Sequence, residues 1–145
     1  MISWHTDRSV TLMRERTGGQ GYLGANLYGE AIAGAHAGMT AEGDNRVLMI
    51  KVVKDLLSIY MKNPDFVYNG DFVKLINKEE LYDLGRMSVV LQMIEKFKLD
   101  RLIGKMSSLK GSGKSNYDIL MFETSDEIQE LALAHGEKLA IASCI

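Results

Sequence analysis

One carboxylate in this sequence stands in a setting suited to proton transfer. Glu42 lies in a glycine-rich stretch, directly before Gly43 and an amphipathic segment, and Asp44 and Asn45 follow it. A carboxylate that is buried against apolar surface has a raised pKa and can act as a general base near neutral pH. Glu42 and Asp44 are also typical of a helix start, where acidic side chains cap free backbone N–H groups. The residue pattern by itself favours the helix cap and leaves catalysis as the second interpretation.

Glycine is concentrated ahead of this carboxylate. Eight of the fourteen glycines fall within residues 17–46, which indicates backbone that turns sharply or closely approaches another group. Gly19, Gly21 and Gly24 match the G-x-G-x-x-G pattern of dinucleotide sites, and Asp44 follows 20 residues later. That site requires a preceding strand within a βαβ unit, whereas the residues before the glycines are charged and helix-like. The sequence therefore disfavours a Rossmann-type site.

A second glycine-containing segment resembles the end of a phosphate-binding loop. It consists of Gly113, Lys114 and Ser115. The full pattern requires a glycine at position 108, where the chain has Ser108, and a strand before the loop, where the chain has a helical pattern. A polar linker between two helices is the simpler interpretation of this segment.

Metal ligation is not predicted. The three histidines, His5, His36 and His135, do not share a helix face at the spacing of metal ligands. Cys144 is the one cysteine, so it adds no second thiol and cannot form an internal disulfide. The expected set of metal ligands is therefore empty, and His135 is interpreted as an interface or half-buried residue.

The segments that position these residues follow a helical period. One helix is predicted over residues 3–16, where it is ended by a glycine pair, and a short helix over residues 27–36. A third helix is predicted over residues 44–62, because its apolar side chains recur at three- and four-residue spacing. Thr40 is the predicted N-cap of this third helix.

Two further helical patterns occupy the rest of the chain. One begins at Asn77, with Glu80 three residues later as in a capping box, and runs to Lys110. Its predicted buried stripe consists of Leu81, Leu84, Met87, Leu91, Ile94 and Phe97 and continues through Ile103 and Met106. The last pattern runs from Ser115 or Ser125 to the end, with a predicted buried face of Ile128, Leu131, Ala132, His135, Leu139 and Ala142. No segment predicts a strand, so the expected fold class is an all-α helical bundle.

Composition limits the classes of function. The 145 residues have the length of one domain, and a net charge of −2 gives no basis for a nucleic-acid-binding surface. No run of about 18 apolar residues occurs, so no membrane span is expected. The first residues lack the apolar core of a signal peptide. The last residues still follow a helical pattern, so the chain is expected to be cut from a longer one.

Two linked motifs resemble the flavin-dependent acyl-CoA oxidases, which are relatives of the acyl-CoA dehydrogenases. The similarity covers about residues 12–60 and is carried by Arg14-Glu15, Gly18-Gly19-Gln20-Gly21-Tyr22, Asn26, Gly29-Glu30 and Met39-Thr40-Ala41-Glu42-Gly43-Asp44-Asn45-Arg46-Val47-Leu48-Met49. The helical remainder is similar to the second C-terminal α-domain of such oxidases, through weaker motifs. The predicted division is therefore residues 1–63, with the FAD-facing loop and the glutamate, and residues 64–145, as part of that second helical domain.

The resemblance implies oxidation of a fatty acyl thioester. Glu42 matches the base of the family, which removes a proton α to the thioester carbonyl while a hydride leaves the β-carbon for the flavin. The product is a trans-2-enoyl-CoA, and O2 then reoxidises the flavin and gives hydrogen peroxide. The backbone N–H of Glu42 is expected to help polarise the thioester carbonyl.

The same resemblance implies how FAD is held. Gly18, Gly19 and Gln20 match the loop that contacts the adenosine diphosphate part of an FAD molecule bound mainly by the neighbouring subunit. Asp44 and Asn45 match positions close to the flavin, and they favour an oxidase over a dehydrogenase. A homodimer is therefore expected.

The resemblance also implies missing parts, because the family places an N-terminal α-domain, a β-barrel and most of the flavin-binding surface ahead of this region. The chain is thus expected to be an acyl-CoA oxidase fragment of fatty acid β-oxidation that is inactive alone and needs those domains or a second subunit. Its location is expected to be the peroxisome in a eukaryote or the cytoplasm in a bacterium. The alternatives are an acyl-CoA dehydrogenase and a non-catalytic helical interaction module. Leu27, where a basic residue is common, and Ile50, where glutamine is common, favour the module.

Overall fold

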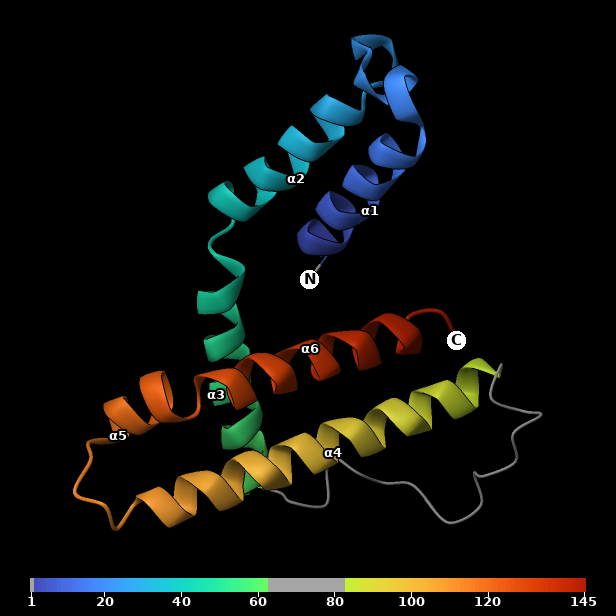
Figure 1. Cartoon of the computed structure of the whole chain (residues 1–145). Helices are drawn as coiled ribbons and strands as arrows, with labels where there is room; N and C mark the ends of the chain where they lie inside the picture. Colours follow the sequence, from blue (N-terminus) through green and yellow to red (C-terminus); the bar gives the residue numbers. More distant parts are fainter. Residues whose placement is uncertain (1, 63–82) are drawn as a thin grey trace. The chain divides into compact units, whose positions relative to one another are not determined.

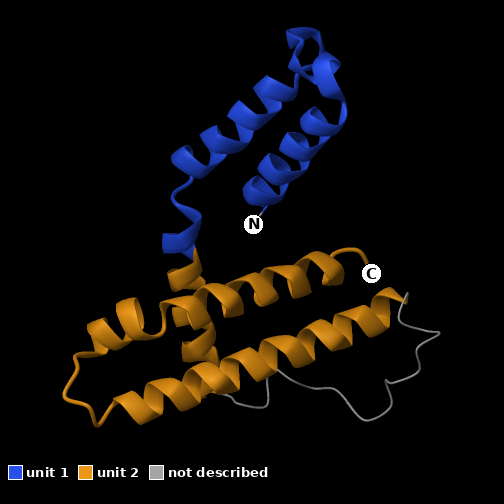
Figure 2. Ribbon diagram, in the orientation of Figure 1, with its two compact units in different colours: residues 1–48 blue, residues 49–145 orange. Residues whose placement is uncertain are grey.

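The computed structural model describes residues 2–62 and 83–145, and all regular secondary structure within these ranges is helical (Figure 1). The predicted all-α fold class is confirmed. The chain divides into two compact units, one up to Leu48 and the other from Met49 onward (Figure 2). Among the described helices, none is long and apolar enough to cross a membrane.

The first unit is a helical hairpin. Helix α1 spans Ile2–Arg16 and α2 spans Tyr28–Ala41, and the two helices lie side by side (Figure 1). Between them the chain makes two short 3-10 turns, at Gly18–Tyr22 and Gly24–Asn26. The helix predicted over residues 3–16 is confirmed, whereas the helix predicted over residues 27–36 is longer than expected.

Two backbone positions build the turn of this hairpin. Gly18 has φ of 66°, the left-handed conformation that commonly ends a helix and that glycine adopts without strain. Gly21 is buried, and a Cβ there would lie 2.3 Å from the carbonyl oxygen of Arg14. A side chain at this position is therefore excluded by the backbone of α1. Leu27 also has a left-handed φ, of 57°, which is unusual for a leucine and strains the start of α2.

The second unit contains the antiparallel pair α4 and α6, which pack along their lengths (Figure 1). Helix α4 spans Leu84–Leu109 and α6 spans Ser125–Ala142. Helix α5, Asn116–Asp118, and a π-helical turn, Ile119–Glu123, connect them. Helix α3 spans Asn45–Lys62, in agreement with the predicted helix over residues 44–62. The side chains that are almost completely buried include Val53, Leu99, Leu102, Ile119, Ile128 and Leu131.

The start of α4 differs from the prediction. Asp83 has extended backbone angles, and its Oδ1 accepts a hydrogen bond from the N–H of Gly85, so Asp83 is the N-cap. The helix therefore begins at Leu84 and not at residue 77. The predicted capping box of Asn77 and Glu80, and the stripe position Leu81, lie outside the described residues.

The buried face of α4 was also predicted wrongly. The residues of α4 that are buried are Ser88, Glu95, Leu99 and Leu102. Of the predicted stripe, Leu84, Met87, Ile94 and Phe97 remain 38% to 69% exposed, whereas Leu91, Ile103 and Met106 are half-buried. On α6 the prediction holds for Ile128, Leu131 and Ala132, which are buried, whereas Leu139 is exposed.

Candidate functional site

Glu42 lies at the junction of α2 and α3. It is the C-cap residue of α2, and its backbone N–H donates to the carbonyl oxygen of Gly38 at 3.1 Å. Gly43 follows with φ of 106°, a value that glycine adopts without strain. This turn separates Glu42 from the first turn of α3, so the side chain is free of a capping role there.

Asp44 is the residue that caps α3. Its Oδ1 accepts hydrogen bonds from the backbone N–H of Arg46 at 2.8 Å and of Val47 at 3.3 Å. The helix-cap interpretation is therefore confirmed for Asp44. The prediction of Thr40 as N-cap is wrong, because Thr40 lies inside α2 and its hydroxyl donates to the carbonyl oxygen of His36.

A cavity of about 720 Å³ lies beside Glu42 within the first unit. Helices α1 and α2 and the first turn of α3 supply its walls, which are lined by Ile2, Ser3, Thr6, Ala31, Gly34, Ala35, Gly38, Glu42, Gly43, Asn45 and Leu48. The lining is mainly apolar or small, and Glu42 is its one ionisable group. A pocket of this size and composition is typical of small-molecule sites.

Asn45 also borders this cavity and joins two elements of the unit. Its Nδ2 donates to the hydroxyl oxygen of Ser3 at 3.1 Å, in a half-buried contact between the start of α3 and the first turn of α1. Glu42 itself is exposed. The apolar burial that would adapt a carboxylate to act as a base is therefore not supplied by the described residues.

The predicted cofactor loop lies at the other end of the hairpin. Gly18, Gly19 and Gln20 are exposed, and a Cβ at either glycine would meet no atom within 4 Å. The carbonyl oxygen of Gln20 accepts a hydrogen bond from Asn26 Nδ2 at 2.5 Å, which fixes the loop. The structure thus brings Glu42 and Asn45 together and places the loop about 20 Å away, the length of α2.

A smaller cavity of about 320 Å³ lies beside that loop. Arg14, Gly21, Tyr22 and Glu30 are among its lining residues. The Nε atom of Arg14 is buried and has no hydrogen-bond partner among the residues that the structure describes. Arg14 and Glu30 therefore give this cavity one basic and one acidic side chain.

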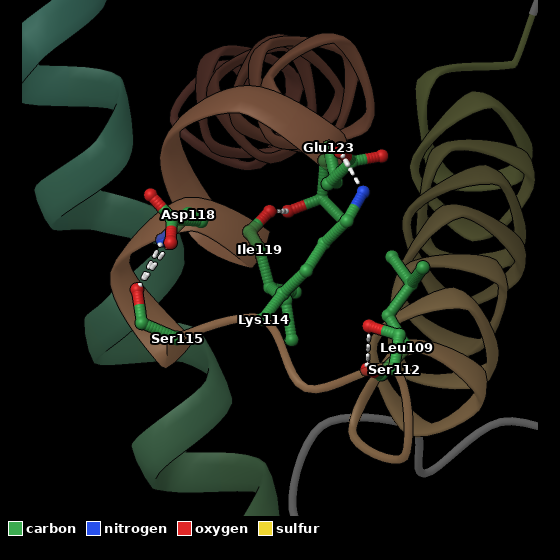
Figure 3. Close-up of polar contacts among 8 residues, drawn as sticks. Leu109, Ser112, Lys114, Ser115, Asp118, Ile119 and Glu123 are labelled. Carbon is green, nitrogen blue, oxygen red and sulfur yellow. Dashed lines mark hydrogen bonds and ion pairs between the residues drawn. The ribbon is translucent and has the colours of Figure 1, made fainter.

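The segment around Lys114 does not form a phosphate site. Figure 3 shows Lys114 paired with Glu123, while the Ser115 hydroxyl donates to Asp118 Oδ2 at 2.7 Å. Ser115 also accepts from the N–H of Asp118, which makes it the N-cap of α5. These contacts confirm the interpretation as a polar linker between helices.

One cluster of ionisable side chains was missed by the sequence analysis. Glu95 of α4 is fully buried, and its two oxygens contact His135 Nδ1 at 2.5 Å and Lys138 Nζ at 2.6 Å, both from α6. Burial raises the pKa of Glu95, but the hydrogen bonds from His135 and Lys138 outweigh it, so the pKa lies below its usual value. The cluster joins the two helices, and His135 is half-buried at their interface, as predicted.

Metal binding finds no support in the described ranges. No group of three or more His, Cys, Asp or Glu side chains within residues 2–62 and 83–145 is arranged to hold a metal ion.

Comparison with known proteins shows to which family part of the chain is similar. Residues 1–57 match the family model described as the acyl-CoA oxidase C-alpha1 domain. The resemblance to the acyl-CoA oxidases is confirmed for this part of the chain. A curated relative, the peroxisomal acyl-coenzyme A oxidase 3 of Arabidopsis thaliana, is 38% identical over 61 residues. That match covers 42% of this chain but only 9% of the relative, and no solved structure matches the chain.

The residues of this chain that match the oxidase family model include every predicted site residue. Glu42, Asp44 and Asn45 and the loop of Gly18 to Gln20 all lie within residues 1–57. The match ends before α4, so the assignment of residues 64–145 to a second oxidase domain stays a prediction.

Proposed function

We propose that this chain is the C-terminal part of a FAD-dependent acyl-CoA oxidase, with Glu42 as the base that removes the α-proton of an acyl-CoA. The observation that carries the proposal is the position of Glu42 as the one ionisable group lining the 720 Å³ cavity, within the segment that matches the oxidases. Reaction of the reduced cofactor with O2 distinguishes this function from that of a dehydrogenase.

The placement of Glu42 is difficult to explain by stability. A negative charge at the C-terminus of a helix opposes the helix dipole, and Glu42 is the C-cap of α2. Its carboxylate makes no hydrogen bond within the described part of the chain, whereas Asp44 supplies the cap of α3. A carboxylate that stabilises neither helix is better explained by chemistry, which argues against the non-catalytic module.

FAD would be held by the loop of Gly18, Gly19 and Gln20, with Asp44 and Asn45 near the flavin end. The open space at both glycines allows close approach of a ligand to the backbone, and the guanidinium of Arg14, which lines the neighbouring cavity, would suit a phosphate. When bound, FAD would accept the hydride from the β-carbon of the substrate. Glu42 would take the α-proton onto a carboxylate oxygen, and its N–H is already bonded to Gly38. The predicted polarisation of the thioester carbonyl by that N–H therefore requires the turn to open.

The exposure of Glu42 gives other parts of an acyl-CoA oxidase a specific role in this proposal. Because an exposed carboxylate is a weak base, the upstream part of the enzyme or a second subunit must cover the cavity and exclude water. We therefore propose that the chain alone is inactive and that the functional enzyme is a homodimer. A peroxisomal location is part of this proposal, since the Arabidopsis relative is named as a peroxisomal enzyme.

A chimeric enzyme tests the proposal. Residues 1–57 would replace the corresponding segment of the Arabidopsis oxidase, and peroxide release with acyl-CoA would be measured. We expect an active chimera whose kcat falls about 10²–10⁴-fold with Glu42→Gln, while acyl-CoA binding persists. The matched control is Asp55→Asn, which neutralises an exposed carboxylate that pairs with Lys51 in α3.

Two results would contradict the assignment. If Glu42→Gln and Asp55→Asn chimeras retain equal rates, Glu42 is not the base. If the chimera reduces FAD with acyl-CoA but releases no peroxide, the residues belong to a dehydrogenase. In the isolated chain, Glu42→Gln should stabilise the first unit slightly, by about 0.3–1 kcal/mol, because it removes an unfavourable charge at the end of α2.

A further inference from the structure

Ser3 and Asn45 connect the starts of two helices that lie 42 positions apart in the sequence. Asn45 Nδ2 donates to the Ser3 hydroxyl oxygen at 3.1 Å, and both residues are half-buried. Ser3 belongs to the first turn of α1, and Asn45 is the first residue of α3. Both residues line the cavity of about 720 Å³ that Glu42 also lines. This hydrogen bond therefore joins α1 to the end of the turn that carries Glu42.

The turn that carries Glu42 is otherwise held by local contacts at its two ends. On the α2 side, the N–H of Glu42 donates to the carbonyl oxygen of Gly38. On the α3 side, Asp44 caps the helix. Between them Gly43 has φ of 106°, and glycine restricts the backbone less than any other residue. These contacts fix each helix end, but they do not by themselves fix the first turn of α3 relative to α1. The hydrogen bond between α1 and α3 supplies that restraint.

The carboxylate of Glu42 depends on the backbone for its position. It is exposed and makes no hydrogen bond with the described residues, although it lines the cavity. No side-chain partner among these residues orients it, so the turn places it. A displacement of about 1 Å in a reacting group can lower a rate by about 10²-fold. A restraint on the turn is therefore a restraint on the proposed chemistry.

We propose that Ser3 is a positioning residue for this base. Through Asn45 it holds the turn in the arrangement in which the Glu42 carboxylate lines the cavity. The inference rests on the proposed function, because it takes Glu42 as the base. Asn45 keeps a second amide N–H and its Oδ1 for other contacts, so the bond to Ser3 is compatible with the proposed place of Asn45 near the flavin.

Hydrogen exchange of the purified 145-residue chain tests the restraint without an assay of activity. In Ser3→Ala we expect the amides of residues 42–48 to exchange about 2–10-fold faster, the factor that corresponds to one net hydrogen bond, while exchange within residues 28–38 stays unchanged. Ser9→Ala is the matched control, because Ser9 lies in the same helix and its hydroxyl contacts His5 of that helix. Both substitutions change intrinsic helix propensity equally. Equal exchange of residues 42–48 in the two variants would overturn the proposal.

Kinetics of the chimera that carries residues 1–57 test the consequence for the reaction. We expect Ser3→Ala to lower kcat about 2–10-fold and to leave KM for acyl-CoA unchanged, because substrate contacts are kept and the position of the base is not. Ser3→Thr, which retains a hydroxyl, should restore kcat. In a Glu42→Gln background Ser3→Ala should have no further effect, because there is no base left to position. A contribution of Ser3 to stability alone does not predict this dependence on Glu42.

The results distinguish failure of this inference from failure of the proposed function. If Glu42→Gln lowers kcat but Ser3→Ala has the same kcat as Ser9→Ala, Glu42 is the base and Ser3 does not position it. If Ser3→Ala lowers kcat by the same factor with and without Glu42→Gln, Ser3 acts independently of the base and the inference is wrong. If Glu42→Gln itself leaves kcat unchanged, the proposed function fails and this inference fails with it.

Discussion

Replacing Lys138 by methionine tests whether the buried carboxylate of Glu95 governs the stability of the α4–α6 pair. Methionine keeps an apolar stem but removes the ammonium, so among the described residues Glu95 is left with His135 as its partner. Removing one partner of a buried ion pair costs about 3–5 kcal/mol, because the remaining charge is not compensated. We expect about 3 kcal/mol, the lower end of that range, since His135 remains at 2.5 Å.

Urea unfolding gives the measurement, followed by far-UV circular dichroism. For a unit of about 100 residues the denaturant slope is about 1–1.5 kcal/mol/M, so the midpoint should fall by about 2–3 M. The single tryptophan, Trp4, lies in α1, and its fluorescence should report an unchanged transition of the first unit. Lys51→Met is the matched control, because Lys51 forms an exposed pair with Asp55 worth about 0.3–0.5 kcal/mol. A Lys138→Met shift no larger than that of Lys51→Met would refute the reasoning.

The pH dependence of this contribution follows from the pKa of Glu95. The folded-state pKa is lowered below the ordinary value of 4.5 by the hydrogen bonds that outweigh burial. The stabilisation is therefore complete above pH 4.5 and is lost as the pH falls through the folded-state pKa. The pKa values of Glu127 and Glu130 are lowered by Lys105 and Lys98, so they act in the same direction. We expect the unfolding midpoints of wild type and Lys138→Met to converge in acid.

Two further predictions concern the first unit and the start of α3. Gly21→Ala should destabilise the hairpin by about 2–3 kcal/mol, as measured by Trp4 fluorescence, because the new Cβ would meet the Arg14 carbonyl. Gly24→Ala, where the structure leaves open space, should change stability little, and an equal loss would contradict this explanation. Asp44→Ala should cost about 1 kcal/mol through loss of the α3 cap, whereas Asp44→Asn should cost much less, because asparagine also caps. Equal losses for the two Asp44 variants, measured by circular dichroism, would exclude capping.

Helix limits were predictable where they depend on local signals. The predicted ranges 3–16 and 44–62 agree with α1 and α3 to within one residue at each end. Helix α2 was predicted too short, because Gly34 and Gly38 lower the intrinsic helix propensity of that segment. Packing against α1 stabilises a helix that its own sequence disfavours, and this tertiary contribution is not visible in local spacing.

The buried face of α4 could not be predicted, because its decisive residue is charged. Hydrophobic spacing favours the stripe of Met87, Ile94 and Phe97, whereas the face that is buried carries Glu95. A buried carboxylate is tolerated only with compensating partners, and these come from α6, 40 and 43 residues later. Sequence spacing therefore identified one apolar stripe of α4, whereas the buried side chains lie on another face of the helix.

The position of Glu42 in the candidate site was also not predictable from the local sequence. From the local sequence, helix capping was the favoured explanation for both Glu42 and Asp44. In the structure the two residues have different positions. Asp44 caps α3, whereas Glu42 ends α2, where its charge is unfavourable, and lines a cavity without a hydrogen bond from the described residues. Natural proteins retain such local conflicts mainly at functional sites. The conflict is consistent with the proposal that Glu42 is the base, and because its side chain is exposed, that proposal requires other parts of the oxidase to cover the cavity.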